Sequence, residues 1–179
     1  MNRIISRLLF PLLLLSATQA YADRSFVISP SLGGAKISNI SGYSNAAFIR
    51  VDGSFFPIPE FGVGAFVAGY QDFKPANGNN GTAIKVNGYG VGITGRWPVS
   101  PHVQPYARID YMRWNAEAKG LGLSIAKQSG GSPGIALGVQ VPIWRMLGGK
   151  LGVKAEVSAY NKVSDANLRQ FSIGWLFEF

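Results

Sequence analysis

The clearest pattern in the sequence is an alternation of apolar and polar residues near the C-terminus. One face of the last segment carries Phe171, Ile173, Trp175, Phe177 and Phe179. The residues between them, from Gln170 to Glu178, are mostly small or polar. A repeat of two residues is the signature of a β-strand, because successive side chains of a strand point to opposite faces. Residues 132–144 alternate in the same way, and this predicts a second strand.

The same alternation predicts eight strands along the chain. They cover residues 25–37, 46–57, 61–73, 83–97, 103–117, 132–144, 150–161 and 168–179. Each runs to about 11–15 residues, which is long against the five or six usual in soluble sheets but suits strands that cross a membrane at a tilt. Tight turns are expected at 57–60, 98–102 and 145–149, and longer loops at 38–45, 74–82, 118–131 and 162–167. Short turns at one end and longer loops at the other are the layout of an outer-membrane barrel.

The direction of the apolar faces distinguishes a membrane barrel from a soluble one. Soluble barrels bury their large apolar residues, whereas outer-membrane barrels turn them outward and keep polar residues inside. Here the polar faces carry Gly62, Gly64, Gly88, Gly90, Gly92, Gly138 and Gly174. Such glycines suit a narrow lumen, where side chains from eight strands compete for space, better than the solvated face of a soluble β-sandwich. We therefore predict an all-β, eight-stranded antiparallel up-and-down transmembrane β-barrel.

Charged residues on the polar faces form a balanced set. Those expected inside the barrel are Arg50, Asp52, Arg96, Arg108, Asp110, Lys154, Glu156 and Glu178. Four are basic and four are acidic, so they can neutralise one another, as buried charges must. We therefore predict a network of ion pairs in the lumen.

Aromatic residues gather toward both ends of the predicted strands. Near the turns lie Phe55, Phe56, Phe61, Trp97, Tyr106, Trp144 and Phe179; toward the loops lie Tyr43, Tyr70, Phe73, Tyr111, Trp114, Tyr160 and Phe171. Two aromatic belts at the membrane interfaces are typical of barrels. Some of these side chains are nevertheless expected to point inward.

The N-terminal segment differs from the rest of the chain. Arg3 and Arg7 precede a short run of leucines, and small residues follow up to Ala22. This order is that of a secretory signal peptide, and the apolar run is too short to cross a bilayer as a helix. We predict a signal peptide over residues 1–22 and a barrel over residues 23–179. Because the two arginines leave with the signal peptide, the net charge falls from +8 to +6.

The composition agrees with these expectations. Charged residues make up 15% of the chain, well below the roughly 25% usual in soluble domains. The chain also holds 23 glycines, above the usual share of about 7%. Cysteine is absent, which excludes a disulfide scaffold, a thiolate metal site and a thiol nucleophile.

Three stretches of the sequence carry a resemblance to a known family. They are Gly95-Arg96-Trp97-Pro98-Val99, then Tyr106-Ala107-Arg108-Ile109-Asp110-Tyr111-Met112-Arg113-Trp114, and finally Ser132-Pro133 with Ala136, Gly138 and Val139. In these stretches the chain resembles the eight-stranded OmpA-type transmembrane domain, and its short loops resemble those of OmpX-like and opacity-type barrels. The C-terminal alternation that ends at Phe179 resembles the assembly signal of Gram-negative outer-membrane proteins. That resemblance implies recognition by the barrel-assembly machinery.

Two features depart from that family. We expect no peptidoglycan-binding domain after Phe179, and hence no tether to the cell wall. Gln140 stands where a carboxylate in the lumen of the family is expected. The family's detailed pattern of internal ion pairs is therefore not carried over to this chain.

No arrangement of residues in the sequence is suited to catalysis. Some eight-stranded barrels deacylate lipid A with a His-x-Ser-Asn motif, in which the histidine activates the serine. Here Tyr43-Ser44-Asn45 lacks the histidine, and the single histidine, His102, falls in a predicted periplasmic turn. The sequence has one histidine and no cysteine, and its carboxylates are scattered, so we expect neither a metal site nor a cofactor. We predict that the protein is not an enzyme.

Basic residues gather at the predicted loop end. They are Lys36, Lys74, Lys85, Arg113, Lys119, Lys127, Lys162 and Arg169. Lipopolysaccharide presents phosphates at this level of the outer leaflet, and charge-assisted hydrogen bonds from these side chains would bind them. The alternative is a plain solvated rim. Nucleic acid is not an expected partner, because the predicted signal peptide directs the chain to export.

The sequence leaves three functions open. The first is a structural or surface-interaction role in the Gram-negative outer membrane, with lipopolysaccharide bound at the rim. The second is adhesion to a host surface ligand, or evasion of host defences, through the outer loops. The third is a narrow ion channel, although the interior of an eight-stranded barrel is just wide enough for side chains to fill. In each case we expect a monomer embedded in outer-membrane lipid.

Overall fold

The computed structural model describes residues 24–38, 42–76, 82–97, 99–100, 102–120, 123–146, 148–163 and 166–179. The predicted signal peptide lies outside these residues, so its assignment stays a prediction. No helix in the described part of the chain is long and apolar enough to span a bilayer.

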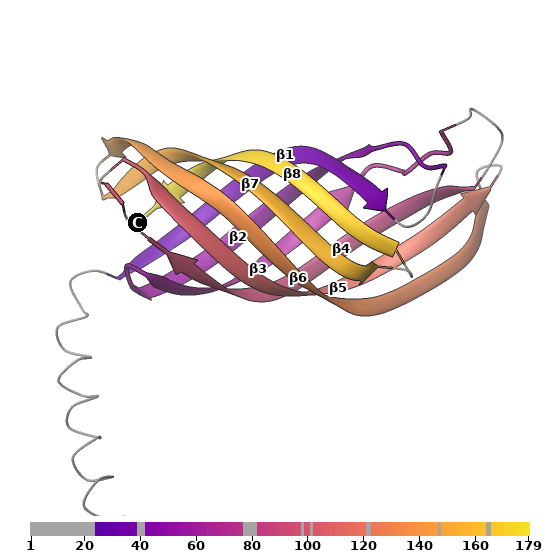
Figure 1. The fold of residues 1–179 in the computed structure, drawn as a ribbon, viewed down its shortest axis with the longest axis horizontal. Helices are drawn as coiled ribbons and strands as arrows, with labels where there is room; N and C mark the ends of the chain where they lie inside the picture. The colour runs from indigo at the N-terminus through magenta and orange to yellow at the C-terminus, as the bar shows by residue number, and fades with distance from the viewer. Residues whose placement is uncertain are drawn as a thin grey trace, which may run out of the picture.

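Eight antiparallel strands form the fold. Their bounds are β1 Ser25–Ser38, β2 Ala46–Ile58, β3 Phe61–Tyr70, β4 Ala83–Arg96, β5 Gln104–Gly120, β6 Leu123–Met146, β7 Gly149–Val163 and β8 Ala166–Glu178. Each strand pairs with the next, and β1 pairs with β8, so the sheet closes into a barrel (Figure 1). The predicted fold class is confirmed, and each predicted strand overlaps an observed one.

The connections between strands lie at two opposite ends of the barrel, which we call the turn end and the loop end. At the turn end, residues 59–60, 97–103 and 147–148 link successive strands, and both the start of β1 and the end of β8 lie there (Figure 1). Gly148 has a φ of 84°, a conformation that glycine adopts without a steric cost. The loop end holds the connections 39–45, 71–82, 121–122 and 164–165. In outer-membrane barrels the short turns face the periplasm, so the loop end is the outer end.

The hairpin of β5 and β6 extends further than the sequence predicted. Pairing continues to Gly120 and Leu123, so most of the loop expected at 118–131 is strand. The glycine-rich start of β6 is strand rather than the expected loop. Its glycines instead make room for aromatic rings of β5, since a Cβ on Gly130 would lie 2.6 Å from Cζ2 of Trp114. The hairpin is flanked by β4 and projects at the loop end (Figure 1).

The two faces of the barrel wall have opposite character. Large apolar side chains cover the outside, and Leu32 and Ile49 are 69% and 67% exposed. Charged side chains lie inside, and Arg50 and Asp110 are only 1% and 2% exposed. This inversion of the soluble pattern stabilises the barrel only where lipid, rather than water, surrounds the wall.

Inward-facing glycines make room for large neighbours in the lumen. A Cβ on Gly138 would lie 2.5 Å from Cζ of Tyr106, and one on Gly88 would lie 2.7 Å from Sδ of Met112. Real Cβ atoms do not approach other atoms so closely. The high glycine content therefore reflects a crowded interior.

Candidate functional site

Three strands contribute charged pairs to the middle of the lumen. These pairs are Arg50 and Asp52 on β2, Arg108 and Asp110 on β5, and Lys154 and Glu156 on β7. The members of each pair are two residues apart, so both point inward from a strand. All six side chains are buried.

Arg108 holds the centre of this cluster. Its guanidinium lies 3.3 Å from a carboxylate oxygen of Asp52, 2.9 Å from one of Asp110 and 2.8 Å from one of Glu156. These carboxylates come from β2, β5 and β7, so one side chain joins three strands across the lumen. A planar guanidinium with five donors suits such a role better than the single ammonium of lysine.

Arg50 forms the second junction. It contacts Asp52 at 2.7 Å and donates a hydrogen bond of 2.6 Å to the hydroxyl of Tyr160. That hydroxyl donates in turn to Asp110 at 2.8 Å. The Arg50 guanidinium also stacks over the ring of Phe66, 3.7 Å from its centroid, an arrangement that stabilises a desolvated cation.

The central cluster is neutral as a whole. Lys154 contacts Asp52 at 2.7 Å, and the Tyr106 hydroxyl donates a 2.6 Å hydrogen bond to Glu156. Three cations therefore face three carboxylates. Two tyrosine hydroxyls complete the cluster by hydrogen bonds to its charged groups.

A smaller charged group lies nearer the turn end. Arg96 contacts Glu178 at 3.1 Å, and Lys150 contacts the other oxygen of Glu178 at 3.2 Å. Arg96 also donates a 2.8 Å hydrogen bond to the carbonyl of Pro59 and stacks over Phe56. This group ties β4 and β8 to the first turn. Gln140, at the expected carboxylate position, is buried opposite Lys154.

The lumen above the central cluster, toward the loop end, is apolar. The layer consists of Ala35, Ala46, Phe48, Phe66, Ala68, Tyr70, Phe73, Val86, Met112, Trp114, Ala116, Tyr160, Val163 and Leu168. The predicted outer aromatic belt is thus wrong for Tyr70, Phe73, Trp114 and Tyr160, which are buried in this layer. At the turn end Phe56 and Tyr106 are likewise buried, whereas Trp97 and Trp144 are exposed. Of the residues expected in the outer belt, Tyr111 and Phe171 are exposed.

The basic residues expected at the loop end lie in the loop half of the barrel. Lys36, Lys74, Arg113, Lys127, Lys162 and Arg169 are exposed, and Lys85 and Lys119 are half-buried. Lys36 and Arg169 are direct partners across the seam between β1 and β8. Lys85 and Lys127 lie on either side of Glu117 on β5. The structure thus brings four of these eight residues together in two pairs.

Nothing in the described part of the chain resembles a catalytic or metal centre. His102 is exposed at the turn end, away from the outer loops. Among the residues that the structure describes, no three His, Cys, Asp or Glu side chains are grouped to hold a metal ion. The buried carboxylates instead contact arginine and lysine.

Several polar residues of the lumen were absent from the expected network. Tyr160 bridges Arg50 and Asp110, and Tyr106 donates to Glu156. The Gln170 amide donates a 2.5 Å hydrogen bond to the hydroxyl of Tyr70 and accepts one from Ser158. Their positions in the alternation place them on the inner face. This parity is the signal in the sequence that indicates the inner face, whereas an aromatic side chain alone indicates a membrane belt equally well.

A closed antiparallel barrel with an apolar outer wall and ion pairs inside defines the protein as an integral outer-membrane barrel. A family model of the outer membrane protein beta-barrel domain matches residues 8–179. The chain belongs to that family, and its place is the Gram-negative outer membrane. No curated protein sequence matches the chain.

Solved structures share the fold at low sequence identity. Ail, the attachment invasion locus protein of Yersinia pestis, is 15% identical with a TM-score of 0.60; the match covers 87% of this chain and 97% of Ail. Neisserial surface protein A is 16% identical with a TM-score of 0.63, over 87% and 97% of the two chains. The N-terminal barrel of OprF from Pseudomonas aeruginosa is 12% identical with a TM-score of 0.61, over 86% and 97%. Ail has also been solved with the heparin analogue sucrose octasulfate.

Proposed function

We propose that this protein is a closed surface barrel that binds lipopolysaccharide at its basic rim. Buried ion pairs and an apolar layer lie across the lumen, so the proposal assigns it no transport activity. It assigns no catalysis either, since the single histidine lies at the turn end. The activity is instead assigned to the outer surface of the loop half.

The observation that carries the proposal is a pair of like charges. Lys36 and Arg169 are cross-strand partners on β1 and β8, and both are exposed. Like charges directly opposite each other destabilise a sheet. A phosphate group between them would relieve this repulsion through charge-assisted hydrogen bonds. The phosphates of lipopolysaccharide lie at this level of the outer leaflet.

An apolar furrow on the barrel wall ends at Arg169. It has a volume of about 340 Å³, and its apolar lining includes Ile135, Leu137, Val157 and Ala159. Ala159 pairs with Ile135 on one side and Arg169 on the other, so a small residue hollows the wall between larger ones. An acyl chain in this furrow would lie directly below a phosphate bound by Arg169. The furrow therefore supports an anionic lipid with acyl chains as the ligand.

The second group of rim cations is less well suited to phosphate. Glu117 lies between Lys85 and Lys127 in register. A carboxylate there repels an incoming phosphate and reduces the net positive charge of the group. We therefore expect the seam formed by Lys36 and Arg169 to bind lipopolysaccharide more tightly than this group does.

The test compares two double variants refolded in phosphatidylcholine nanodiscs. One carries Lys36→Gln and Arg169→Gln; the matched control carries Lys85→Gln and Lys127→Gln and loses the same charge. Hydrogen bonds to charged groups contribute about 1.5–3 kcal/mol, so the seam variant should bind lipopolysaccharide at least about tenfold more weakly. The control should lose less than about threefold.

Two results would contradict the proposal. Equal losses in both variants would overturn the seam as the binding site. Unchanged affinity in both variants would overturn binding at the rim altogether. Dephosphorylated lipopolysaccharide provides the ligand control, because it should bind the parent and the seam variant alike.

A second candidate function is contact with a host polyanion. The projecting part of β4, β5 and β6 carries a hollow of about 340 Å³, whose lining includes Lys85, Lys127 and Glu117. The two lysines outnumber the one carboxylate, so these three residues together keep a net positive charge. The likeness to Ail, which has been solved with a sulfated heparin analogue, favours testing a polyanion here. On this hypothesis the Lys85 and Lys127 variant leaves a heparin column at lower salt than the seam variant does. The opposite order would refute the candidate.

We also propose that β8 carries the signal read by the barrel-assembly machinery, and that the protein is a monomer. The residues of the signal, Phe171, Ile173, Trp175, Phe177 and Phe179, all face outward. Phe179→Ala should lower the yield of heat-modifiable barrel in cells but not in detergent refolding. An equal loss in both would mean that the side chain serves stability alone. The proposal of a monomer is tested separately, by light scattering of the barrel in detergent, which measures the oligomeric state.

A further inference from the structure

A pocket at the turn end of the barrel combines cations with exposed apolar side chains. Its volume is about 180 Å³, and its lining includes Gln104, Ile143, Trp144, Arg145 and Lys150. We propose that this turn-end pocket binds the head group of an anionic phospholipid, such as phosphatidylglycerol, from the inner leaflet of the outer membrane. The pocket lies at the opposite end of the barrel from the seam proposed to bind lipopolysaccharide, so neither proposal rests on the other.

A β-bulge in β6 shapes the pocket. Pro142 pairs with Gly152 and Trp144 pairs with Leu151, so Ile143 is an extra residue in β6. Bulges are frequent at the rims of barrels and beside functional sites, because they redirect side chains. Here the extra residue leaves both Ile143 and Trp144 exposed, by 63% and 70%, and it returns the residue after them to the inner side of the wall.

That residue, Arg145, lies directly opposite Lys150 on β7. Like charges in this position destabilise a sheet. Lys150 contacts Glu178 at 3.2 Å, but Arg96 contacts the same carboxylate at 3.1 Å. The other described carboxylate of the turn end, Glu60, lies on the β2–β3 turn, across the barrel from β6 and β7. Three cations therefore stand beside one carboxylate, and a bound anion would reduce this surplus through charge-assisted hydrogen bonds.

The level of the pocket in the membrane identifies the class of anion. The turn end faces the periplasm, so head groups at this level belong to the inner leaflet, which consists of phospholipid. Trp144 agrees with the preference of tryptophan for the membrane–water interface. A phosphate held by Arg145 and Lys150 would keep its acyl chains beside Ile143 and Trp144, on the outer side of the wall. These apolar side chains favour a lipid over a free phosphate ion.

Size and charge narrow the choice among phospholipids. An engineered cavity of about 150 Å³ accommodates benzene, so the turn-end pocket accommodates a phosphate group but not an acyl chain. None of the described residues that line it is acidic, so they offer no partner to the ammonium of a zwitterionic head. Phosphatidylglycerol carries hydroxyls in its place. The buried Gln104 has a side-chain oxygen without a hydrogen-bond partner in the described part of the chain, an acceptor of the kind that hydroxyls need.

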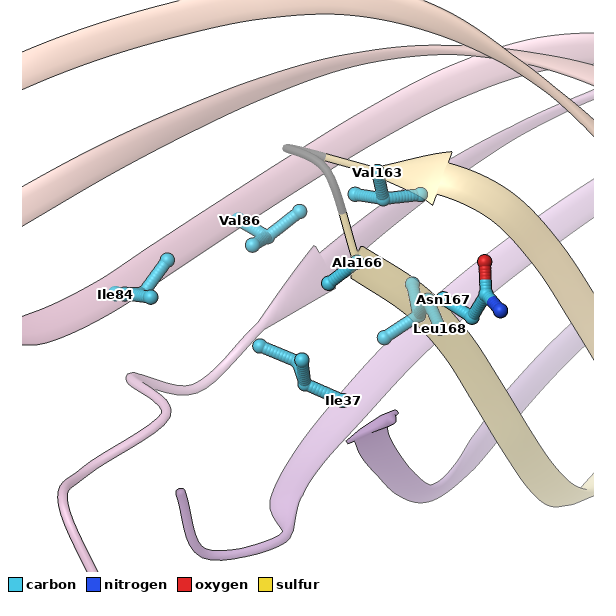
Figure 2. Close-up of a pocket in the computed structure, with 7 residues that line it drawn as sticks. All are labelled: Ile37, Ile84, Val86, Val163, Ala166, Asn167 and Leu168. Carbon is cyan, nitrogen blue, oxygen red and sulfur yellow. The ribbon is translucent and has the colours of Figure 1, made fainter. Parts of the chain in front are cut away.

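The hollow at the loop end does not share these features. It has a volume of about 70 Å³, and its lining consists of apolar residues and Asn167 (Figure 2). No charged side chain is among the described residues of that lining. The recognition of an anionic head group is therefore assigned to the turn-end pocket.

Trp144 is a fluorescent reporter in the wall of the pocket itself. Trp97 provides a reference, because it is 57% exposed at the same end of the barrel but does not line the pocket. Replacing all but one of the four tryptophans with phenylalanine gives two barrels, each with a single reporter. Bromine on the acyl chains of a lipid quenches tryptophan at close range, so each barrel measures which lipid occupies the wall beside its reporter.

The experiment compares brominated phosphatidylglycerol with brominated phosphatidylcholine, each mixed into phosphatidylcholine nanodiscs that hold the refolded barrel. A cation near an anionic head strengthens its binding by about fivefold. Trp144 should therefore favour phosphatidylglycerol by at least about tenfold, and Trp97 by less than about threefold.

Two double variants assign this preference to the pocket. Arg145→Gln with Lys150→Gln should lower the preference at the pocket reporter to that at the reference. Lys85→Gln with Lys127→Gln is the matched control, because it loses the same charge at the loop end and should leave the preference unchanged. Arg145→Gln alone keeps the contact of Lys150 with Glu178 and serves if the double variant fails to fold. It should lower the preference by about fivefold.

Each outcome decides the proposal. Equal preferences at Trp144 and Trp97, or a preference that survives in a folded pocket variant, would overturn the pocket as a lipid site. Inorganic phosphate is compared with sodium chloride at the same ionic strength. Displacement of phosphatidylglycerol by phosphate but not by chloride would assign the pocket to a free ion and overturn the lipid. Loss of lipopolysaccharide binding in the seam variant does not bear on these results, because that variant keeps the lining of the turn-end pocket.

Discussion

Removing the central arginine of the lumen should destabilise the barrel strongly. Arg108 contacts Asp52, Asp110 and Glu156 at 3.3, 2.9 and 2.8 Å, so Arg108→Met leaves three buried carboxylates with two cations. A pair of unit charges 4 Å apart attracts by about 4 kcal/mol at an effective dielectric constant of 20, but desolvation offsets most of this. Removing one partner of a buried pair costs about 3–5 kcal/mol. We expect the upper part of that range, because three contacts are lost at once.

A second substitution tests whether charge balance is the cause. Glu156→Gln removes one negative charge and keeps a hydrogen-bond acceptor for Tyr106. The double variant with Arg108→Met is therefore neutral again, and it should be more stable than the sum of the single effects by at least about 1.5 kcal/mol, within the usual range for residues in contact. Urea unfolding in phosphatidylcholine vesicles, followed by tryptophan fluorescence, measures the four free energies of unfolding. Additive effects, or a loss below about 1 kcal/mol for Arg108→Met, would refute a stabilising ion network.

Three further predictions concern the wall and the lumen. Gly138→Ala should lower the unfolding free energy by about 1–3 kcal/mol, because the new Cβ would lie 2.6 Å from the carbonyl oxygen of Ala155. The control is the outward-facing Gly34→Ala, whose Cβ has nothing within 4 Å and should not destabilise the barrel. A loss of stability at both sites would refute the crowding argument. Ile109→Arg places a charge on the lipid-facing wall and should lower the unfolding free energy by about 2–4 kcal/mol if the residue lies near the bilayer midplane. Val99→Arg in a turn should change the unfolding free energy by less than about 0.5 kcal/mol. Equal losses would contradict the assigned outer face. In planar bilayers the refolded barrel should give no steady single-channel conductance, and a stable open level would revive the narrow channel.

The alternation of residues was sufficient to predict the barrel and its inner face. The parity of each strand places Arg50, Asp110 and Lys154 inside because a strand has only two faces. Which partners they meet depends on how the strands are staggered around the barrel, and the alternation carries no information on the stagger. The three-way contact of Arg108 was therefore beyond the sequence.

Two other features could not be predicted for a different reason. The inner aromatics Tyr70 and Trp114 look like interface residues in the sequence, because an aromatic ring suits both a membrane belt and an apolar lumen. The Gly130–Gly131 pair looks like a loop, because its role depends on rings on the neighbouring strand. In both cases the deciding partner lies on another strand, far away in the sequence.

The seam between β1 and β8 joins the two extremes of the barrel domain. Ser29 donates a hydrogen bond to the carbonyl of Trp175, 146 residues away, and the backbones of Phe26 and Phe179 exchange two more. These bonds cannot form before β8 has been synthesised, so the unfinished sheet has two open edges that invite pairing with other chains. Loop closure over such a separation is entropically costly and slow. Closure of the barrel is thus a late step in folding, because the topology pairs the first strand with the last.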